Sequence, residues 1–125
     1  MKKTTLFRLA LIGSLVAALQ NAPAGSAVAL APHNQVFTSF GHPKEIAKQI
    51  ALDEARRKYG NNVRILAASD VSGYCAIAVA RVANGNWLIG VSLGKRSATE
   101  AETLALGYCR KAGGINPQIK SAFKG

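Results

Sequence analysis

The chain has 125 residues, of which 16 are basic and 6 acidic, so its formal net charge is +10. This length fits one domain with a single core, and a hydrophobic content of 49% excludes a disordered polyelectrolyte. The positive charge does not choose among nucleic acid, an anionic envelope surface and an acidic protein as partner, because its field attracts all three.

The N-terminus is ordered like a secretory signal peptide. Basic residues come first, an apolar run over 9–19 follows, and small residues precede possible cleavage points after Ala24 and Ala27. The apolar run is short for a permanent membrane anchor, which needs about 20 residues, so an uncleaved anchor is the less favoured alternative. We therefore expect residues 1–27 to be a signal peptide, cleaved after Ala24 or Ala27, and the mature protein to be periplasmic or secreted from a bacterium.

The mature chain stays basic. Removing Lys2, Lys3 and Arg8 with the signal leaves thirteen basic and six acidic residues, a net charge of +7. No cysteine precedes Cys75, so the acylated cysteine of a lipoprotein is missing and we expect no lipid anchor. After signal cleavage we also expect no transmembrane segment. Residues 28–34 lack periodicity and are predicted to be a mobile leader to a single domain over 35–125.

The first half of this domain predicts a strand, a helix and a second strand. Alternation over 35–40 indicates a short strand. Pro43 suits a helix start and Gly60 a helix end, with small apolar residues recurring on one face between them. Val63 to Ala68 is predicted to be the strand that follows.

The second half opens on a predicted hairpin. Residues 75–83 and 86–93 are strand-like and flank Asn84-Gly85, a pair typical of a two-residue type I′ turn, in which Val82 would face Trp87. A capping box, Ser97 with Glu100, predicts the start of a second helix, and 113–114 its end. A last strand is expected after Pro117.

A shift of 54 residues aligns 46–68 with 100–122 without a gap, and eight of the 23 pairs are identical. This indicates an internal β-α-β duplication, although two alanine-rich helices followed by glycine and a strand would also align well. The predicted fold is an α+β two-layer sandwich, with one sheet of about five strands and two helices on one face.

The second half resembles a known family. The motifs are an Ala-Ile-Ala strand, a tryptophan in the next strand, a serine-led helix start with an alanine-glutamate pair, and an Ala-Leu pair followed by cysteine. In this chain they are Ala76-Ile77-Ala78, Trp87, Ser97 with Ala101-Glu102, and Ala105-Leu106 with Cys109. Over about residues 74–123 the chain is similar to the small exported bacterial domain of unknown function 4189. The resemblance implies an exported α+β domain with no assigned biochemical role.

Cys75 and Cys109 are the two cysteines of the chain. In an oxidising compartment a disulfide between them is the expected state. The bond would close a loop of about 35 residues and stabilise the fold by about 4 kcal/mol. The bridge requires the helices to cover the strand face that carries Cys75, Ile77 and Val79. Two buried free thiols, or an intermolecular bond, are the alternatives.

No arrangement of residues indicates catalysis. His33 and His42 have no evident triad partner, and Glu45 and Glu100 fall in the first turns of helices, where the dipole favours negative charge. No spacing of His or Cys indicates a metal site, and no glycine-rich loop a phosphate site. We therefore expect no catalytic residues, no metal, no cofactor and no enzyme activity.

Two basic clusters are candidate anion sites. Their residues are Arg56, Arg57, Lys58 and Arg64 in the first half, and Arg110 and Lys111 in the second. Cations at helix C-termini are also explained by the helix dipole. Nucleic acid is an unlikely partner because few aromatic residues lie near either cluster.

The sequence thus favours a non-enzymatic binding or interaction module of the bacterial envelope or extracellular space. Its binding surface would lie on the sheet or hairpin side of the domain, and its partner would be an unknown protein or envelope component. A basic binder of polyanions, either nucleic acid or anionic glycan, is one alternative. A small cell-wall hydrolase is the other.

Overall fold

The structure is a computed structural model that describes residues 25–125. In chain order the elements are β2 (Gly25–Ala31), a 3-10 turn η1 (Pro32–Asn34), β3 (Gln35–His42), α2 (Lys44–Tyr59), β4 (Arg64–Ser69), β5 (Tyr74–Arg81), β6 (Trp87–Lys95), α3 (Ala98–Lys111) and β7 (Ile115–Lys124). Residues 1–24 of the predicted signal peptide lie outside the described part of the chain.

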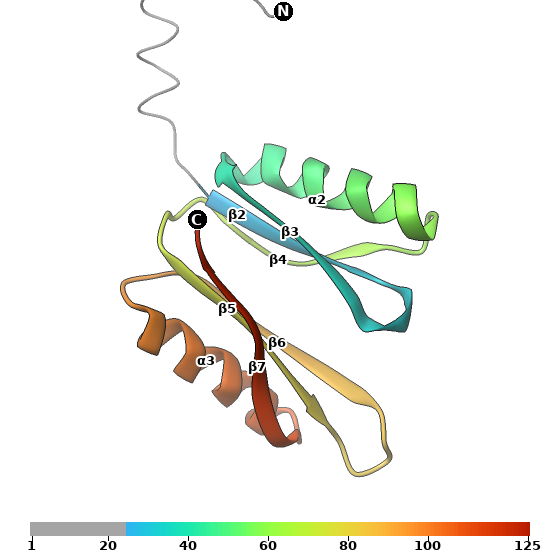
Figure 1. The fold of residues 1–125 in the computed structure, drawn as a ribbon, viewed down its shortest axis with the longest axis vertical. Helices are drawn as coiled ribbons and strands as arrows, with labels where there is room; N and C mark the ends of the chain where they lie inside the picture. Colours follow the sequence, from blue (N-terminus) through green and yellow to red (C-terminus); the bar gives the residue numbers. More distant parts are fainter. Residues whose placement is uncertain (1–24) are drawn as a thin grey trace, which may run out of the picture.

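The strands form two antiparallel three-stranded sheets, in the orders β3-β2-β4 and β6-β5-β7. Helix α2 packs on the first sheet and α3 on the second, and the two sheets face each other between them. Figure 1 shows the four layers in the order helix, sheet, sheet, helix. The α+β class is consistent with the prediction. The single sheet of about five strands with both helices on one face is wrong.

The physical reason lies in the two faces of each central strand. In both β2 and β5, alanines alternate with larger residues, so both faces of the strand are apolar and need cover. A helix covers the alanine face, and the opposite sheet covers the other. A single sheet with helices on one side would leave the second face in water.

Each helix packs on its sheet through small side chains. The first layer joins Ala27, Ala29 and Ala31 of β2 to Ala47, Ala51 and Ala55 of α2, and the second joins Ala76, Ala78 and Ala80 of β5 to Ala101, Ala105 and Cys109 of α3. All are at most 4% exposed. The approach is close: a Cβ added to Gly90 would lie 2.5 Å from the Ala105 carbonyl oxygen.

The layer between the sheets changes along its length. Val28 and Ile77 are fully buried, and Ser26 Oγ lies 3.7 Å from Cys75 Sγ. Further along the same strands, Leu30 and Val79 are only partly buried. The sheets are therefore tightly packed near one end and less tightly packed near the other.

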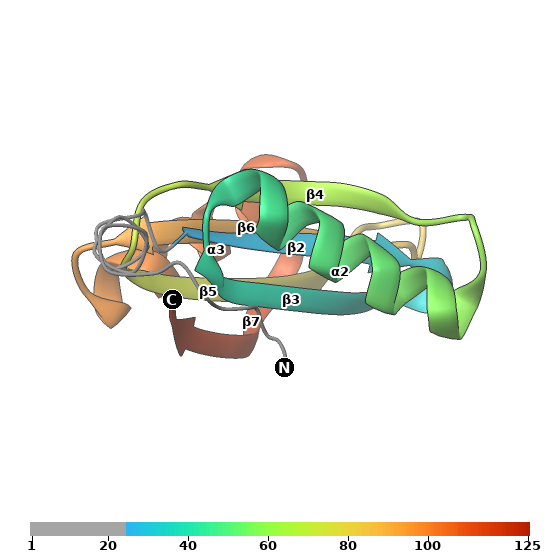
Figure 2. The same cartoon turned by 90° about the horizontal axis from the view of Figure 1, so that it is seen from above.

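We call these ends the C-terminal end and the hairpin end. At the C-terminal end, Gly73 and Gly125 exchange two backbone hydrogen bonds, of 3.0 and 2.8 Å. The hairpin end carries η1, the β5–β6 hairpin and the C-termini of both helices. Figure 2 shows β2, β3, β5 and β6 extending along the long direction between the two ends.

The two halves share one topology. Each half runs strand, strand, helix, strand, and each sheet places its second strand, first strand and third strand in that order. In the sequence, a shift of 49 residues aligns the alanines of β2 with those of β5, and a shift of 54 residues aligns Ala47 and Ala51 of α2 with Ala101 and Ala105 of α3. The repeated unit is thus ββαβ, longer by one strand than the β-α-β unit predicted.

The missing strand is β2. Residues 28–34, predicted to be a mobile leader, lie in β2 and η1. β2 is the central strand of its sheet, and its residues Ala27 to Ala29 have no exposed surface. β2 consists of small and apolar residues, has no polar face and directly follows a signal-like region. Its hydrophobic periodicity therefore did not reveal it as a strand.

The β5–β6 hairpin forms as predicted but in a different register. Arg81, not Val82, faces Trp87. Val82 N–H donates to the Asn86 carbonyl and Gly85 N–H to the Val82 carbonyl, both at 2.9 Å, and Gly85 has φ 89°. The connection is therefore a three-residue loop with glycine at the left-handed position. The shift of one residue places Ile77 and Val79 of β5 and Ile89 and Val91 of β6 on one face, toward the other sheet.

Both predicted helices form, with boundaries within two residues of those predicted: Pro43 precedes α2 instead of being its first residue, and α3 ends at Lys111. α3 begins after Ser97, whose Oγ accepts from the Glu100 N–H at 3.0 Å, while Glu100 Oε1 accepts from the Arg96 N–H at 3.0 Å. α2 begins after Pro43 and ends before Gly60. Its first turn uses a distant cap, because Asp70 Oδ1 accepts from the Lys44 N–H at 2.9 Å.

Candidate ligand-binding cleft

Two adjoining cavities lie at the hairpin end. One has a volume of about 370 Å³ and the other about 200 Å³, and both are lined by Val79 and Trp87. The other lining residues are Ala80, Arg81 and Ile89 from the hairpin strands, Ile115, Asn116, Gln118 and Lys120 from β7, His33 and Asn34 from η1, and Gln35 at the start of β3. We call these two lobes together the Trp87 cleft.

Trp87 is held in place although 43% of its surface is exposed. The guanidinium carbon of Arg81 lies 4.3 Å from the centroid of the indole ring, a cation–π contact between directly paired residues. Arg81 Nη1 also donates to the Gly85 carbonyl at 3.2 Å. The hairpin thus fixes a flat apolar surface with a cation beside it.

The polar groups of the cleft carry one sign of charge. Arg81 and Lys120 are exposed cations, each lining a different lobe, and no carboxylate lines either lobe. Within residues 25–125 the ion pairs are Lys48–Glu45 and Arg56–Asp53, on α2. Neither cleft cation is therefore neutralised by a carboxylate in the described chain.

The duplication explains why the cleft lies in this place. The pairing of β2 with β3 ends at Ala31–Gln35, whereas the pairing of β5 with β6 continues past the equivalent Ala80–Leu88 to one further pair, Arg81–Trp87. The shorter turn closes with His33 and Asn34 at φ 64° and 58°, positions where asparagine is favoured. One long hairpin opposite one short turn leaves the apolar face of the long hairpin uncovered.

The six predicted anion-site residues all belong to the hairpin end, but they do not form one site. Arg56, Arg57 and Lys58 end α2, Arg64 begins β4, and Arg110 and Lys111 end α3. The two helices lie on opposite outer layers, separated by both sheets. Arg56 already pairs with Asp53 at 3.4 Å. The structure thus concentrates positive charge at this end without bringing the two predicted clusters together.

The predicted disulfide is wrong, because Cys75 and Cys109 are free. Cys75 lies in the layer between the sheets beside Ser26, whereas Cys109 lies in the layer between β5 and α3. The helix covers the face carrying Ala76 and Ala78 instead of the face carrying Cys75, so the sheet itself separates the two sulfurs. Burial raises the pKa of the Cys109 thiol, and a backbone hydrogen bond at Gly90 opposes this in part.

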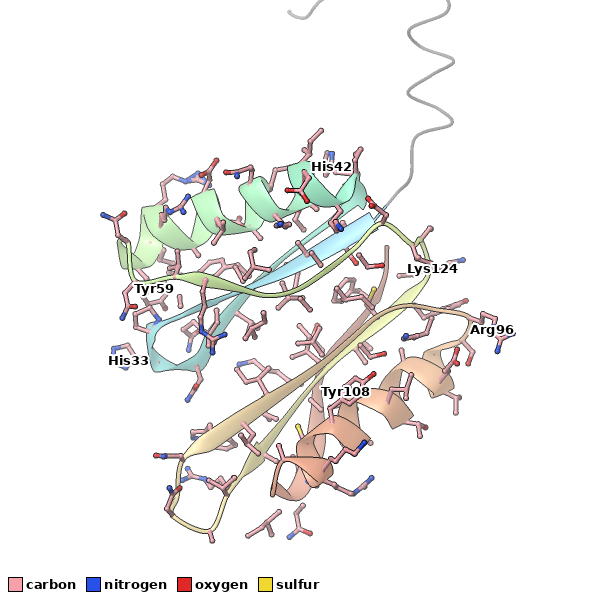
Figure 3. The ribbon with its side chains drawn as sticks, turned by 180° about the vertical axis from the view of Figure 1, so that it is seen from behind. His33, His42, Tyr59, Arg96, Tyr108 and Lys124 are labelled. Carbon is pink, nitrogen blue, oxygen red and sulfur yellow. The ribbon has the colours of Figure 1, made fainter. Side chains whose placement is uncertain are left out.

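The histidines lie at opposite ends of the molecule. Figure 3 shows His33 near Tyr59 at the hairpin end, and His42 at the other end with Arg96 and Lys124. His42 is exposed, and the nearby Asp70 accepts a backbone hydrogen bond at the start of α2. Within residues 25–125 no three His, Cys, Asp or Glu side chains gather as metal ligands would. The described helices include none that is both long and apolar enough to cross a bilayer.

Comparisons with protein-family models, with curated proteins and with solved structures find no match to this chain.

Arg81, Trp87 and Lys120 are cleft residues that no sequence pattern predicted as site residues. One signal was present, since Trp87 is the only tryptophan and begins a strand beside a turn. The predicted two-residue turn paired Trp87 with Val82, so the cation–π contact with Arg81 was not predicted. Lys120 joins the cleft only through tertiary packing, which no local pattern predicts.

Proposed function

We propose that this chain is an exported, non-enzymatic binding module of the bacterial envelope or extracellular space, and that the Trp87 cleft is its binding surface. The observation that carries the proposal is a large aromatic side chain, 43% exposed, on the wall of a two-lobed apolar cavity. Ligand sites in proteins are typically concave and apolar with a few polar groups, and this cleft has that character.

The lining of the cleft supports binding rather than catalysis. Its ionisable side chains are Arg81, Lys120 and His33, and no carboxylate, cysteine or hydroxyl side chain accompanies them. A general base with a nucleophile, or a pair of carboxylates, is therefore not part of this surface. Export is supported by the order of charged, apolar and small residues at the N-terminus.

A neutral apolar dye tests this proposal without involving charge. We expect N-phenyl-1-naphthylamine to fluoresce on binding the folded protein, and Trp87→Ala to lower its affinity at least about fivefold through lost contact area. Tyr108→Ala is the matched control, because Tyr108 is an equally exposed aromatic, on α3. Dye binding that is absent, or unchanged by Trp87→Ala, would contradict the proposal.

Binding of a polyanion is a second candidate. The observation in its favour is that eight basic residues belong to the hairpin end: the six named above with Arg81 and Lys120. Four of the six carboxylates, Glu45, Asp70, Glu100 and Glu102, lie at helix starts or beside them, at the C-terminal end. Stronger retention on heparin than an unrelated domain of equal charge would support this candidate, and equal retention would reject it.

A further inference from the structure

We propose that the natural ligand of the Trp87 cleft is a small amphiphilic anion, an apolar chain or ring that ends in a carboxylate or a similar acidic group. This inference rests on the proposed binding function and specifies its ligand. It rests on the juxtaposition of an apolar floor with two cations that have no carboxylate partner.

The floor of the cleft would hold the apolar part. Val79 and Ile89 face each other across the β5–β6 pair and are partly buried, and Trp87 continues the same face of β6. Ile115, 54% exposed, borders the larger lobe. An apolar group placed here would remove these exposed surfaces from water, which is favourable in proportion to the area buried.

The acidic group would lie at the rim. Arg81 borders the larger lobe and Lys120 the smaller one, so an anion near Trp87 meets a cation in either direction. Arg81 is oriented in advance by its contacts with the indole ring and with the Gly85 carbonyl. A planar guanidinium held in this way loses little conformational freedom when it binds a carboxylate.

The charge arrangement selects against other ligands of similar size. A cationic amphiphile would meet two like charges, and a neutral one would leave both cations without a partner. The carboxamides of Gln35, Asn116 and Gln118 can donate hydrogen bonds to an acidic group as well. The volume of the larger lobe, about 370 Å³, falls at the lower end of the range for small-molecule sites, so the ligand is small.

Three ligands of equal length separate charge from apolar contact. We would titrate the protein with octanoate, octanamide and octylammonium by calorimetry at neutral pH and low salt. Octanoate should bind with a Kd on the order of 1 mM, as expected for so few heavy atoms. It should bind about tenfold more tightly than octanamide, since two exposed cations contribute modestly, and octylammonium more weakly still. This preference should shrink as salt is raised.

Variants assign the preference to the two cations. Arg81→Gln and Lys120→Gln should each lower octanoate affinity about threefold and lower octanamide affinity by a smaller factor. Lys95→Gln is the matched control, because Lys95 ends the strand that Trp87 begins and lies at the C-terminal end. Since Arg81 also supports the indole ring, Arg81→Lys should restore most of the preference. Lys120 is exposed, so its substitution leaves the fold intact.

The outcomes separate this inference from the proposed function. Equal affinities for octanoate and octanamide would overturn the anionic ligand while leaving the apolar cleft in place. Binding to vesicles of anionic phosphatidylglycerol without binding of octanoate would overturn it in favour of a membrane surface. If neither the octyl ligands nor the neutral dye bind, the proposed function fails as well.

Discussion

Gly90 shows how single residues set the distance between layers in this protein. It lies on β6 under α3, and a Cβ added there would lie 2.5 Å from the Ala105 carbonyl oxygen and 3.0 Å from Cys109 Sγ. Backbone atoms of a packed helix cannot yield as the end of a flexible side chain can. Gly90 is therefore required for the helix to contact the sheet.

We expect Gly90→Ala to destabilise the protein by about 1–3 kcal/mol, since overpacking forces the helix away from the sheet. Gly107→Ala is the control with the same chemical change. Gly107 lies within α3 with no atom within 4 Å of an added Cβ, so this substitution should stabilise the fold by roughly 0.5–1 kcal/mol. Urea denaturation of both variants measures the difference. Equal effects would contradict the packing described.

The two cysteines should behave as buried thiols. Under non-reducing conditions, intact mass should report two free thiols, and alkylation at neutral pH should be slow until the chain is unfolded. Burial raises the pKa of Cys109 above its ordinary 9.0, so the folded state holds this proton more tightly than the unfolded chain does. The stability associated with this group is present below about pH 9 and is lost as the pH rises further. A mass two units lower, indicating a disulfide, would refute the separation of the cysteines by the sheet.

Among the elements, β2 bears on the cleavage point of the signal peptide that the sequence predicts. It pairs with both β3 and β4, and Ser26 and Ala27 are at most 1% exposed. Cleavage after Ala27 would remove the first three residues of this central strand, whereas cleavage after Ala24 would leave β2 complete. A complete β2 therefore favours the predicted cleavage point after Ala24 over the one after Ala27.

We therefore propose that a signal peptide is removed after Ala24. Intact mass of the exported protein should correspond to a chain beginning at Gly25. A chain prepared to begin at Val28 should be less stable by several kcal/mol, because it lacks buried residues and ladder hydrogen bonds. A natural start at Val28, with full stability, would show that β2 does not need its first three residues.

Local patterns predicted the elements better than their arrangement. The serine cap at Ser97, the glycine after α2 and the hairpin all depend on chemistry that acts within a few residues, and each is confirmed, although Glu100 accepts from the Arg96 N–H instead of the Ser97 N–H. The register of the hairpin depended on whether Gly85 closed a two-residue or a three-residue loop, a choice that the sequence leaves open. Because β2 was missed, the second sheet was missed as well, and no sequence pattern gave a reason to expect four layers instead of two.

At the scale of the whole molecule, duplication and asymmetry have separate consequences. Two ββαβ halves bury their larger apolar faces against each other, which gives a stable scaffold without a cross-link. The halves differ in the hairpin that carries Arg81 and Trp87, and the candidate cleft lies where they differ. Sequence reasoning could find the repeat, but the cleft needs residues from β5, β6, β7 and the β2–β3 turn together.

Charge is also distributed at this scale. Both helices direct their basic C-termini toward the hairpin end, and most carboxylates lie at the C-terminal end. The resulting field should accelerate the approach of an anion toward the cleft. Binding there by a small anion is therefore consistent with the charge of the whole molecule as well as with the residues of the site.

The most direct test of the cleft is a ¹⁵N–¹H NMR titration of the protein with octanoate. The account predicts that the indole N–H of Trp87 and the amides of Arg81, Gln118 and Lys120 shift together and saturate, while those of the outer face of α2, around Ile46, stay unchanged. Shifts centred on α2 or at the C-terminal end, or no saturable shift at Trp87, would contradict it.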